Sequence, residues 1–308
     1  MPAAGKVGSH NPEITPAQAK GGEGDRLTPF RPAFQYTLKR PPFQSLSEGS
    51  AFCSRAKVCH VAETMTPMIW HFGRVGSCLD VAAKLARRGL LADFDSVLCV
   101  SQEHGRGQMR RIWQSPPGNV YATLRLPATP PFTSDFAAPA VGYLLAQALT
   151  DQHIPTHIKW PNDLVAESPQ GAAKFGGILL EERAGIVLAG IGINLSFSPD
   201  AELLRRDHAL PATSLACLGF SDLSPQKFWQ ALVMRTIKVY KETRTLSDCW
   251  PQLLSPYLLG LGKQVVVEGR SSEETTQGLL QGLGPNGGFL LAQNGSVREI
   301  MGTHLTFC

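Results

Sequence analysis

From about Met68 onward, short hydrophobic runs alternate with longer segments whose hydrophobic residues recur at helical spacing. The short runs predict strands, and the longer segments predict amphipathic helices. The strands are expected at 68–73, 96–101, 120–126, 157–160, 176–181 and 186–195. The helices are expected at 79–88, 136–150, 201–206 and 225–243. This succession predicts a mixed α/β domain.

The two ends of the chain have a different texture. The first 50 residues hold seven Pro and six Gly, with no run long enough to bury a face. From Gly262 onward, short strands are separated by glycine-rich turns, among them the hairpin signal Asn294-Gly295. We therefore expect a tail and appendage over 1–60, the main domain over 61–258 and a small β-barrel domain over 259–308.

Composition narrows the classes of function. Charged residues make up 18% of the chain and hydrophobic residues 43%, which excludes a disordered polyelectrolyte. The net charge of +4 is not the basic stripe of a dedicated nucleic-acid binder, and Ile186–Leu195 is too short an apolar stretch to span a membrane. Seven scattered cysteines without a C-x-x-C pair indicate neither a disulfide framework nor a zinc site. Without a signal-peptide core, the chain is expected to be cytoplasmic, binding neither DNA nor membranes.

A basic loop with two glycines follows the 96–101 strand. Gly105 and Gly107 flank Arg106, and Arg110 and Arg111 add positive charge. Glycine lets the backbone approach an anion closely, and guanidinium groups suit phosphate. The alternative is a solvated basic turn.

Lys159 stands at the end of a strand, immediately before the turn at Pro161-Asn162-Asp163. In open sheets ligands bind where strands end, so Lys159 could contact a phosphate as a point charge. Asn162 or Asp163 could lie near a metal ion or simply shape the turn. The alternative is an exposed lysine beside a turn.

Glycines also interrupt segments that otherwise have the pattern of buried strands, at Gly176, Gly190 and Gly192. A bulge, the close approach of a ligand, or plain packing of neighbouring elements would each explain them. Ser77 and Asp80 have capping-box spacing, which accounts for both residues without any ligand.

The motifs occur in a fixed order: GRG-x-x-x-R-x-W-x-SP-x-G from Gly105, KWPNDL from Lys159, K-x-x-GIL-x-E from Lys174 and GIGIN from Gly190. A G-x-x-L-x-F strand follows near the end of the chain. This succession, from about Trp70 to Phe307, resembles the biotin protein ligases. The resemblance implies an α/β fold, with a mixed sheet and helices packed on one side, followed by a small C-terminal SH3-like β-barrel. It does not extend to residues 1–60, where nothing resembles a helix-turn-helix.

The resemblance also implies an adenylate-forming, ATP-dependent reaction. Biotin's carboxylate would attack the α-phosphate of ATP to give biotinyl-adenylate and pyrophosphate, with Mg²⁺ on the triphosphate. A lysine of the biotin carboxyl carrier protein of an acyl-CoA carboxylase would then attack the mixed anhydride. Biotin and ATP are thus expected as substrates, with no tightly bound cofactor, and the enzyme as a monomer or homodimer.

Matching positions give the expected site residues. Lys159 and Arg106 are expected to act in catalysis. The expected substrate contacts are Ser77, Cys78, Gln102, Gly105, Gly107, Gln108, Trp113, Gly176, Gly190 and Gly192. The expected nucleotide contacts are Arg106, Arg110, Arg111, Lys159 and Asn194, with Asn194 also contacting the ATP-bound Mg²⁺.

The chain departs from the family pattern at three positions. Gln108 stands where the family usually has an arginine, Arg110 replaces a glycine of the loop, and Cys78 replaces a threonine after Ser77. These departures leave open a relative that binds biotin without turnover. A lipoate or octanoate ligase of the same fold is the other alternative.

Overall fold

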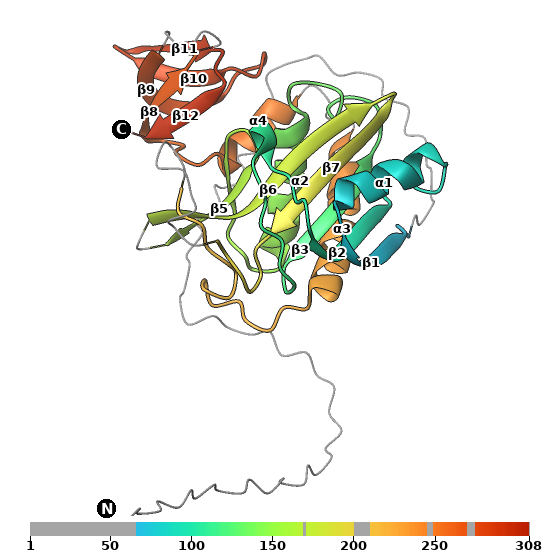
Figure 1. Cartoon of the computed structure of the whole chain (residues 1–308). Helices are drawn as coiled ribbons and strands as arrows, with labels where there is room; N and C mark the ends of the chain where they lie inside the picture. The colour runs from blue at the N-terminus through green and yellow to red at the C-terminus, as the bar shows by residue number, and fades with distance from the viewer. Residues whose placement is uncertain (1–65, 169–170, 200–209, 245–248, 270–274, 308) are drawn as a thin grey trace, which may run out of the picture. The chain divides into compact units, whose positions relative to one another are not determined.

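The computed structural model describes residues 66–168, 171–199, 210–244, 249–269 and 275–307 (Figure 1). The tail and appendage expected over 1–60 and the helix expected at 201–206 lie outside the described residues.

A seven-stranded mixed sheet forms the centre of the main domain, in the order β1-β2-β3-β7-β6-β5-β4. Only β1 and β2 are parallel, and the crossover between them is the helix α1 (Cys78–Arg87). The other neighbouring pairs are antiparallel. The strands are β1 (Ile69–Val75), β2 (Ser96–Gln102), β3 (Val120–Leu126), β4 (His157–Lys159), β5 (Asp163–Ser168), β6 (Gly171–Arg183) and β7 (Ile186–Ile193).

Helices cover both faces of this sheet. Helices α2 (Ala137–Asp151) and α3 (Pro225–Thr243) bury one face, into which Leu98 of β2 points. Its neighbours Val97 and Cys99 point the other way and pack against α1. Figure 1 shows α1 in front of the strands and α3 partly behind them. The mixed α/β class is therefore confirmed, but the helices are not all on one side, because the buried face of α1 needs the opposite face of the sheet.

A second, five-stranded antiparallel sheet follows the short helix α4 (Trp250–Leu254), in the order β11-β10-β9-β8-β12. Buried Val265, Leu280 and Phe289 contribute to its core. The sheet is consistent with the expected small SH3-like barrel, although among the described residues β11 and β12 are edges, so it is not closed. The boundary at 258/259 stays a prediction. The strands are β8 (Gln264–Glu268), β9 (Thr275–Leu283), β10 (Phe289–Gln293), β11 (Ser296–Ile300) and β12 (His304–Phe307).

Strand β5 was not expected from the sequence. Only Leu164–Ala166 of its six residues are apolar, and the strand begins directly after the Pro161–Asn162 turn. Its partner β6 is longer than the expected 176–181 strand, since the two form a hairpin by cross-strand hydrogen bonds. Within the described parts of the chain, no helix is both long and apolar enough to cross a membrane.

Candidate functional site

Three glycines form a strip without side chains on the α1 face of the sheet. Gly177 of β6 pairs with Gly192 of β7, and Gly190 lies two residues further along β7. A Cβ at Gly192 would lie 2.6 Å from the Trp113 ring, and one at Gly190 would lie 2.9 Å from Leu79 Cδ1. These three residues, the glycine strip, therefore allow flat or apolar groups to lie directly on the backbone.

Gly190 and Gly192 face the site as predicted, but Gly176 does not. Gly176 pairs with Ile193, and a Cβ there would meet Leu164, which belongs to the core beneath α2. The prediction for Gly176 is wrong because successive residues of a strand point to opposite faces. The next residue, Gly177, takes its place.

The 102–113 loop folds back across this face. Trp113 N–H donates to the Gly105 carbonyl oxygen at 2.9 Å, and Ser115 Oγ donates to the Trp113 carbonyl oxygen at 2.9 Å. A Cβ at Gly105 would collide with that Trp113 oxygen and lie 2.5 Å from Ser115 Oγ, so the turn requires glycine. Gly107 and Gln108 follow; Gln108 is exposed and begins a short 3₁₀ turn (Gln108–Arg110). The loop thus carries Trp113 onto the glycine strip.

Gln102 ties the loop to the start of α1. Its Oε1 accepts the Cys78 backbone N–H at 2.9 Å, and its Nε2 donates to Ser115 Oγ at 2.9 Å. Both ends of the amide are therefore already used within the chain, which gives Gln102 a structural task beside the substrate contact expected of it.

Ser77 and Cys78, at the start of α1, differ sharply in their surroundings. The Cys78 thiol lies 3.3 Å from the carbonyl oxygens of Val97 and Tyr121, and burial raises its pKa. Cys78 thus points beneath α1. The Ser77 hydroxyl is buried, yet it has no hydrogen-bond partner among the described residues. A buried polar atom without a partner costs stability unless a ligand or water satisfies it, so Ser77 suits a polar ligand atom.

Positive charge gathers at the other end of the strip. Lys159 lies in the row of cross-strand pairs that runs through Asp163, Gly177 and Gly192. Burial lowers the pKa of Lys159, the positive charges of Lys174 and Arg111 lower it further, and Asp163 opposes the shift. Electrostatic coupling of this kind places the three cations near one another.

Lys174 was quoted in a sequence motif but received no predicted role. Its Nζ lies 2.6 Å from Asp163 Oδ1 and 5.4 Å from the centroid of the Trp113 ring. The motif K-x-x-GIL-x-E carried the signal, because the lysine lies on the same strand as Gly177. Three cations beside Asp163 leave an excess of positive charge that suits a phosphate group.

Arg106 does not join this cluster. Its Nη1 and Nη2 each lie 2.9 Å from an oxygen of Asp80 on α1, and Nη2 lies 3.2 Å from Glu181 Oε1 on β6. Glu181 is four residues beyond Gly177 on β6, which at the rise of an extended strand is about 13 Å. The structure therefore places the Arg106 guanidinium at the α1 end of the strip and Lys159 at the opposite end.

Asn194 is buried at the end of β7. Its Nδ2 donates to the Thr213 carbonyl oxygen at 3.0 Å, and its Oδ1 accepts from Asn119 Nδ2 at 3.4 Å. Within the described residues no group of three or more His, Cys, Asp or Glu side chains could hold a metal. The nucleotide and metal contacts of Asn194 stay predictions, as does that of Arg110, whose side chain lies outside the described parts.

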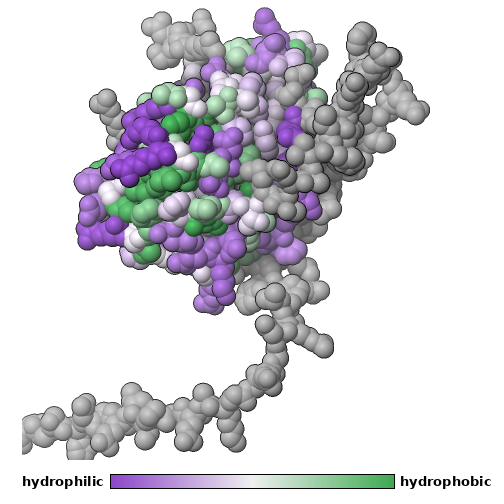
Figure 2. All heavy atoms as spheres, turned by 90° about the vertical axis from the view of Figure 1, so that its right-hand side faces the viewer, coloured by the Kyte–Doolittle hydropathy of each residue, from purple (hydrophilic) through white to green (hydrophobic). Residues whose placement is uncertain are grey.

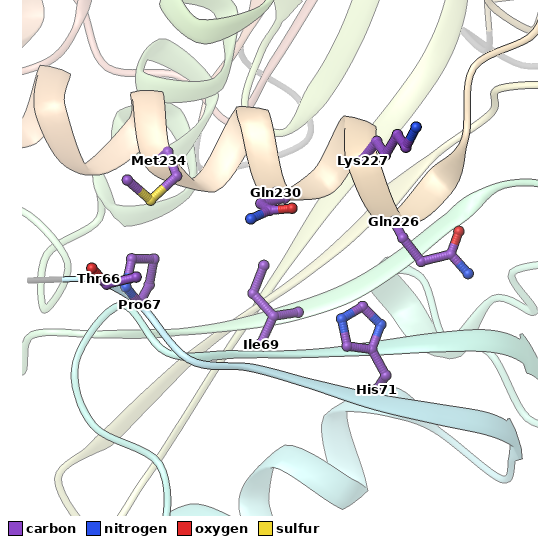
Figure 3. A pocket seen from close by; sticks show the side chains of 8 residues that line it. All are labelled: Thr66, Pro67, Ile69, His71, Gln226, Lys227, Gln230 and Met234. Carbon is purple, nitrogen blue, oxygen red and sulfur yellow. The ribbon is translucent and has the colours of Figure 1, made fainter.

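A separate cavity of about 240 Å³ lies on the α3 face, between the edge strand β1 and α3. Figure 3 shows Ile69 and His71 of β1 opposite Gln226, Gln230 and Met234 of α3. Figure 2, which faces the right-hand side of Figure 1, shows hydrophobic residues gathered among hydrophilic ones. The cavity lies across the sheet from the glycine strip, and the Lys159 cluster does not line it.

Residues 92–198 match the model of the biotin/lipoate A/B protein ligase family. The bifunctional ligase/repressor BirA of Bacillus subtilis is 31% identical over 218 residues, which cover 66% of this chain and 63% of that protein. The biotin--[acetyl-CoA-carboxylase] ligase of Paracoccus denitrificans is 26% identical over 212 residues, covering 63% of this chain and 82% of that protein. The chain thus spans less than two thirds of the Bacillus relative.

Solved structures show the same fold. The biotin protein ligase of Aquifex aeolicus, in complex with biotin and ATP, superposes with a TM-score of 0.63 at 23% identity, over 78% of this chain and 97% of that one. The biotin protein ligase of Leishmania major, in complex with biotinyl-5-AMP, gives a TM-score of 0.50 at 24% identity, over 76% and 98%.

Proposed function

The chain carries a domain of the biotin/lipoate A/B protein ligase family, and from this premise we propose that it is a biotin–protein ligase. One observation carries the proposal: a strip of bare backbone has an unpartnered buried hydroxyl at one end and unneutralised positive charge at the other. A flat, uncharged ring system fits the first end, and an activated phosphate fits the second. Biotinyl-5'-AMP has both parts.

In this proposal two acyl transfers use the same site. A carboxylate oxygen of biotin attacks the α-phosphorus of ATP, and pyrophosphate leaves. The amine of an acceptor lysine then attacks the acyl carbon, and AMP leaves. The ammonium of Lys159 stabilises charge on the carboxylate and α-phosphate, while Lys174 and Arg111 add positive charge beside it. The Ser77 hydroxyl donates to the ureido oxygen above the glycine strip.

Mg²⁺, when bound, supplies charge neutralisation on the triphosphate. The described residues offer no carboxylate cluster for it, and Asp163 is engaged by Lys174. The ion's ligands would therefore come chiefly from ATP itself. We propose the biotin carboxyl carrier protein of an acyl-CoA carboxylase as the acceptor, in line with the name of the Paracoccus relative.

The test is ATP–pyrophosphate exchange by the purified full chain with biotin, lipoate or octanoate as the acid. We expect exchange with biotin and a mass increase of one biotin on a biotin carboxyl carrier domain. Exchange with lipoate or octanoate instead would assign the other activity of the family. Biotin binding measured by calorimetry without any exchange would identify a non-catalytic biotin-binding protein.

The rate of adenylate formation should fall at alkaline pH. Burial and the neighbouring cations lower the pKa of Lys159, so this lysine loses its proton at a lower pH than an ordinary lysine. Only the ammonium form stabilises phosphate charge, so the rate falls as pH rises through that lowered pKa. A pH profile of kcat/KM for exchange measures it. In Lys159→Arg, whose guanidinium stays charged, the residual activity should lack this alkaline fall; an identical fall in both proteins would assign the ionisation elsewhere.

Substituting Gln108→Arg should make the enzyme more selective. Gln108 is exposed on the loop and brings no charge to the activated anhydride, whereas charge-assisted hydrogen bonds are about twice as strong as neutral ones. The wild type should release more biotinyl-adenylate and label bystander lysines. Biotin incorporation into an unrelated lysine-rich protein, at fixed ATP and biotin, compares the two. Equal and negligible labelling by two active proteins would contradict the prediction and point to Arg111 as the clamp.

A further inference from the structure

We propose that Asp80 and Glu181 are positioning residues that hold the 102–113 loop closed over the α1 end of the glycine strip, through Arg106. The inference rests on the proposed ligase function for its consequence, because the enclosed space is where the biotin ring would lie. It reassigns Arg106, expected from the sequence to contact phosphate, to the closure of the loop.

The contact joins three separate elements. Asp80 stands in the first turn of α1, Glu181 stands on β6, and Arg106 stands on the loop between them. Both terminal nitrogens of Arg106 bind Asp80, one oxygen each, and Nη2 also binds Glu181. Planar, two-point pairs of this kind fix direction as well as distance. Arg106 is 33% exposed and Glu181 20% exposed, so water screens the contact only in part.

The backbone passes this constraint on to the rest of the loop. Arg106 forms an isolated antiparallel bridge with Ile112, and the Gly105 carbonyl oxygen accepts the N–H of Trp113. Trp113 in turn lies on Gly192. Fixing the guanidinium at the α1 end therefore also fixes the returning strand of the loop, which carries Arg111 and Trp113 toward the Lys159 end.

A second ion pair on the same loop provides a matched control. Arg74 Nε of β1 lies 3.0 Å from Glu103 Oε1, but these side chains are 75% and 44% exposed and the pair has a single contact. Removing the Glu103 charge costs the loop an ion pair without touching the Arg106 contact. A loop that merely needs negative charge would respond equally to both changes.

A simpler role for Asp80 must also be separated. A carboxylate in the first turn stabilises a helix by itself, so Asp80→Asn could act through α1 alone. In that case Asp80→Asn and Arg106→Gln would have independent effects that add. If the two act through one contact, the double variant should lose no more than either single variant.

The experiment measures hydrogen exchange of the loop amides and biotin affinity in the full chain. The variants are Asp80→Asn, Glu181→Gln, Arg106→Gln, Asp80→Asn with Arg106→Gln, and the control Glu103→Gln. We expect loop exchange and the Kd for biotin each to rise about tenfold in Asp80→Asn, as for a lost charge-assisted pair, less in Glu181→Gln, and under about twofold in the control. Asp80→Glu should restore part of the loss.

The two readouts keep this inference apart from the function. Unchanged loop exchange in Asp80→Asn, additive losses in the double variant, or equal losses in Glu103→Gln would overturn the positioning role. A wild type with no exchange activity on any acid, but with loop exchange that responds as expected, would instead overturn the ligase function and leave the closure standing.

Discussion

Lys159→Ala should abolish adenylate formation, with a loss in the ATP–pyrophosphate exchange rate of at least about a hundredfold, as when one group that stabilises developing charge is removed. Its ammonium lies at the end of β4, in the same row of cross-strand pairs as Gly177 and Gly192. No other lysine of the row can take over, because Lys174 is already paired with Asp163. The measurement is exchange at saturating biotin and ATP.

The fold should survive this change. Burial already disfavours the charged form of Lys159, so removing the ammonium relieves a desolvation cost and should not lower the thermal midpoint. Lys238→Ala, an exposed lysine on α3, is the matched control and should leave exchange intact. Near-normal exchange in folded Lys159→Ala would remove Lys159 from the mechanism.

Gly192→Val should weaken biotin binding by about a hundredfold, the upper range for forcing atoms into a filled space. The backbone of Gly192 is an ordinary strand, where valine is favoured, so the change should not disturb β7 itself. A Cβ there would lie 2.6 Å from the Trp113 ring, which must move off the strip. Calorimetric titration with biotin gives the affinity.

The same substitution at Gly73 of β1 is the control. A Cβ at Gly73 has nothing within 4 Å, so Gly73→Val should bind biotin like the wild type. Thermal unfolding of both variants checks that the sheet persists. A Gly192→Val protein that keeps full affinity would show that biotin does not lie on the strip.

The sequence alone predicted the elements and motifs better than it predicted directions. Lys159, Gly190 and Gly192 were predicted because their motifs stand at strand ends or inside strands. Which of Gly176 and Gly177 faces the site depends on the register of β6 against β7, which local spacing does not specify. The direction of Arg106 depends on Asp80 and Glu181, which lie 26 and 75 positions away.

Strand β5 and the placement of α1 had the same cause. β5 exists through its pairing with β6, and a segment with three apolar residues gives little local signal for that. The side on which α1 packs follows from the parallel crossover between β1 and β2. A one-dimensional pattern shows that α1 has an apolar face, and only the sheet decides where that face goes.

The glycine strip changes how a mutational survey of this protein should be interpreted. Alanine scanning measures importance by removing side-chain atoms, and at Gly177, Gly190 and Gly192 there are none to remove. Such a survey would map the cations and the loop while leaving a blank where the proposed substrate lies. Only a series of added atoms, from alanine through valine to leucine, would outline the floor of the site, and the loss of binding should grow with the volume added.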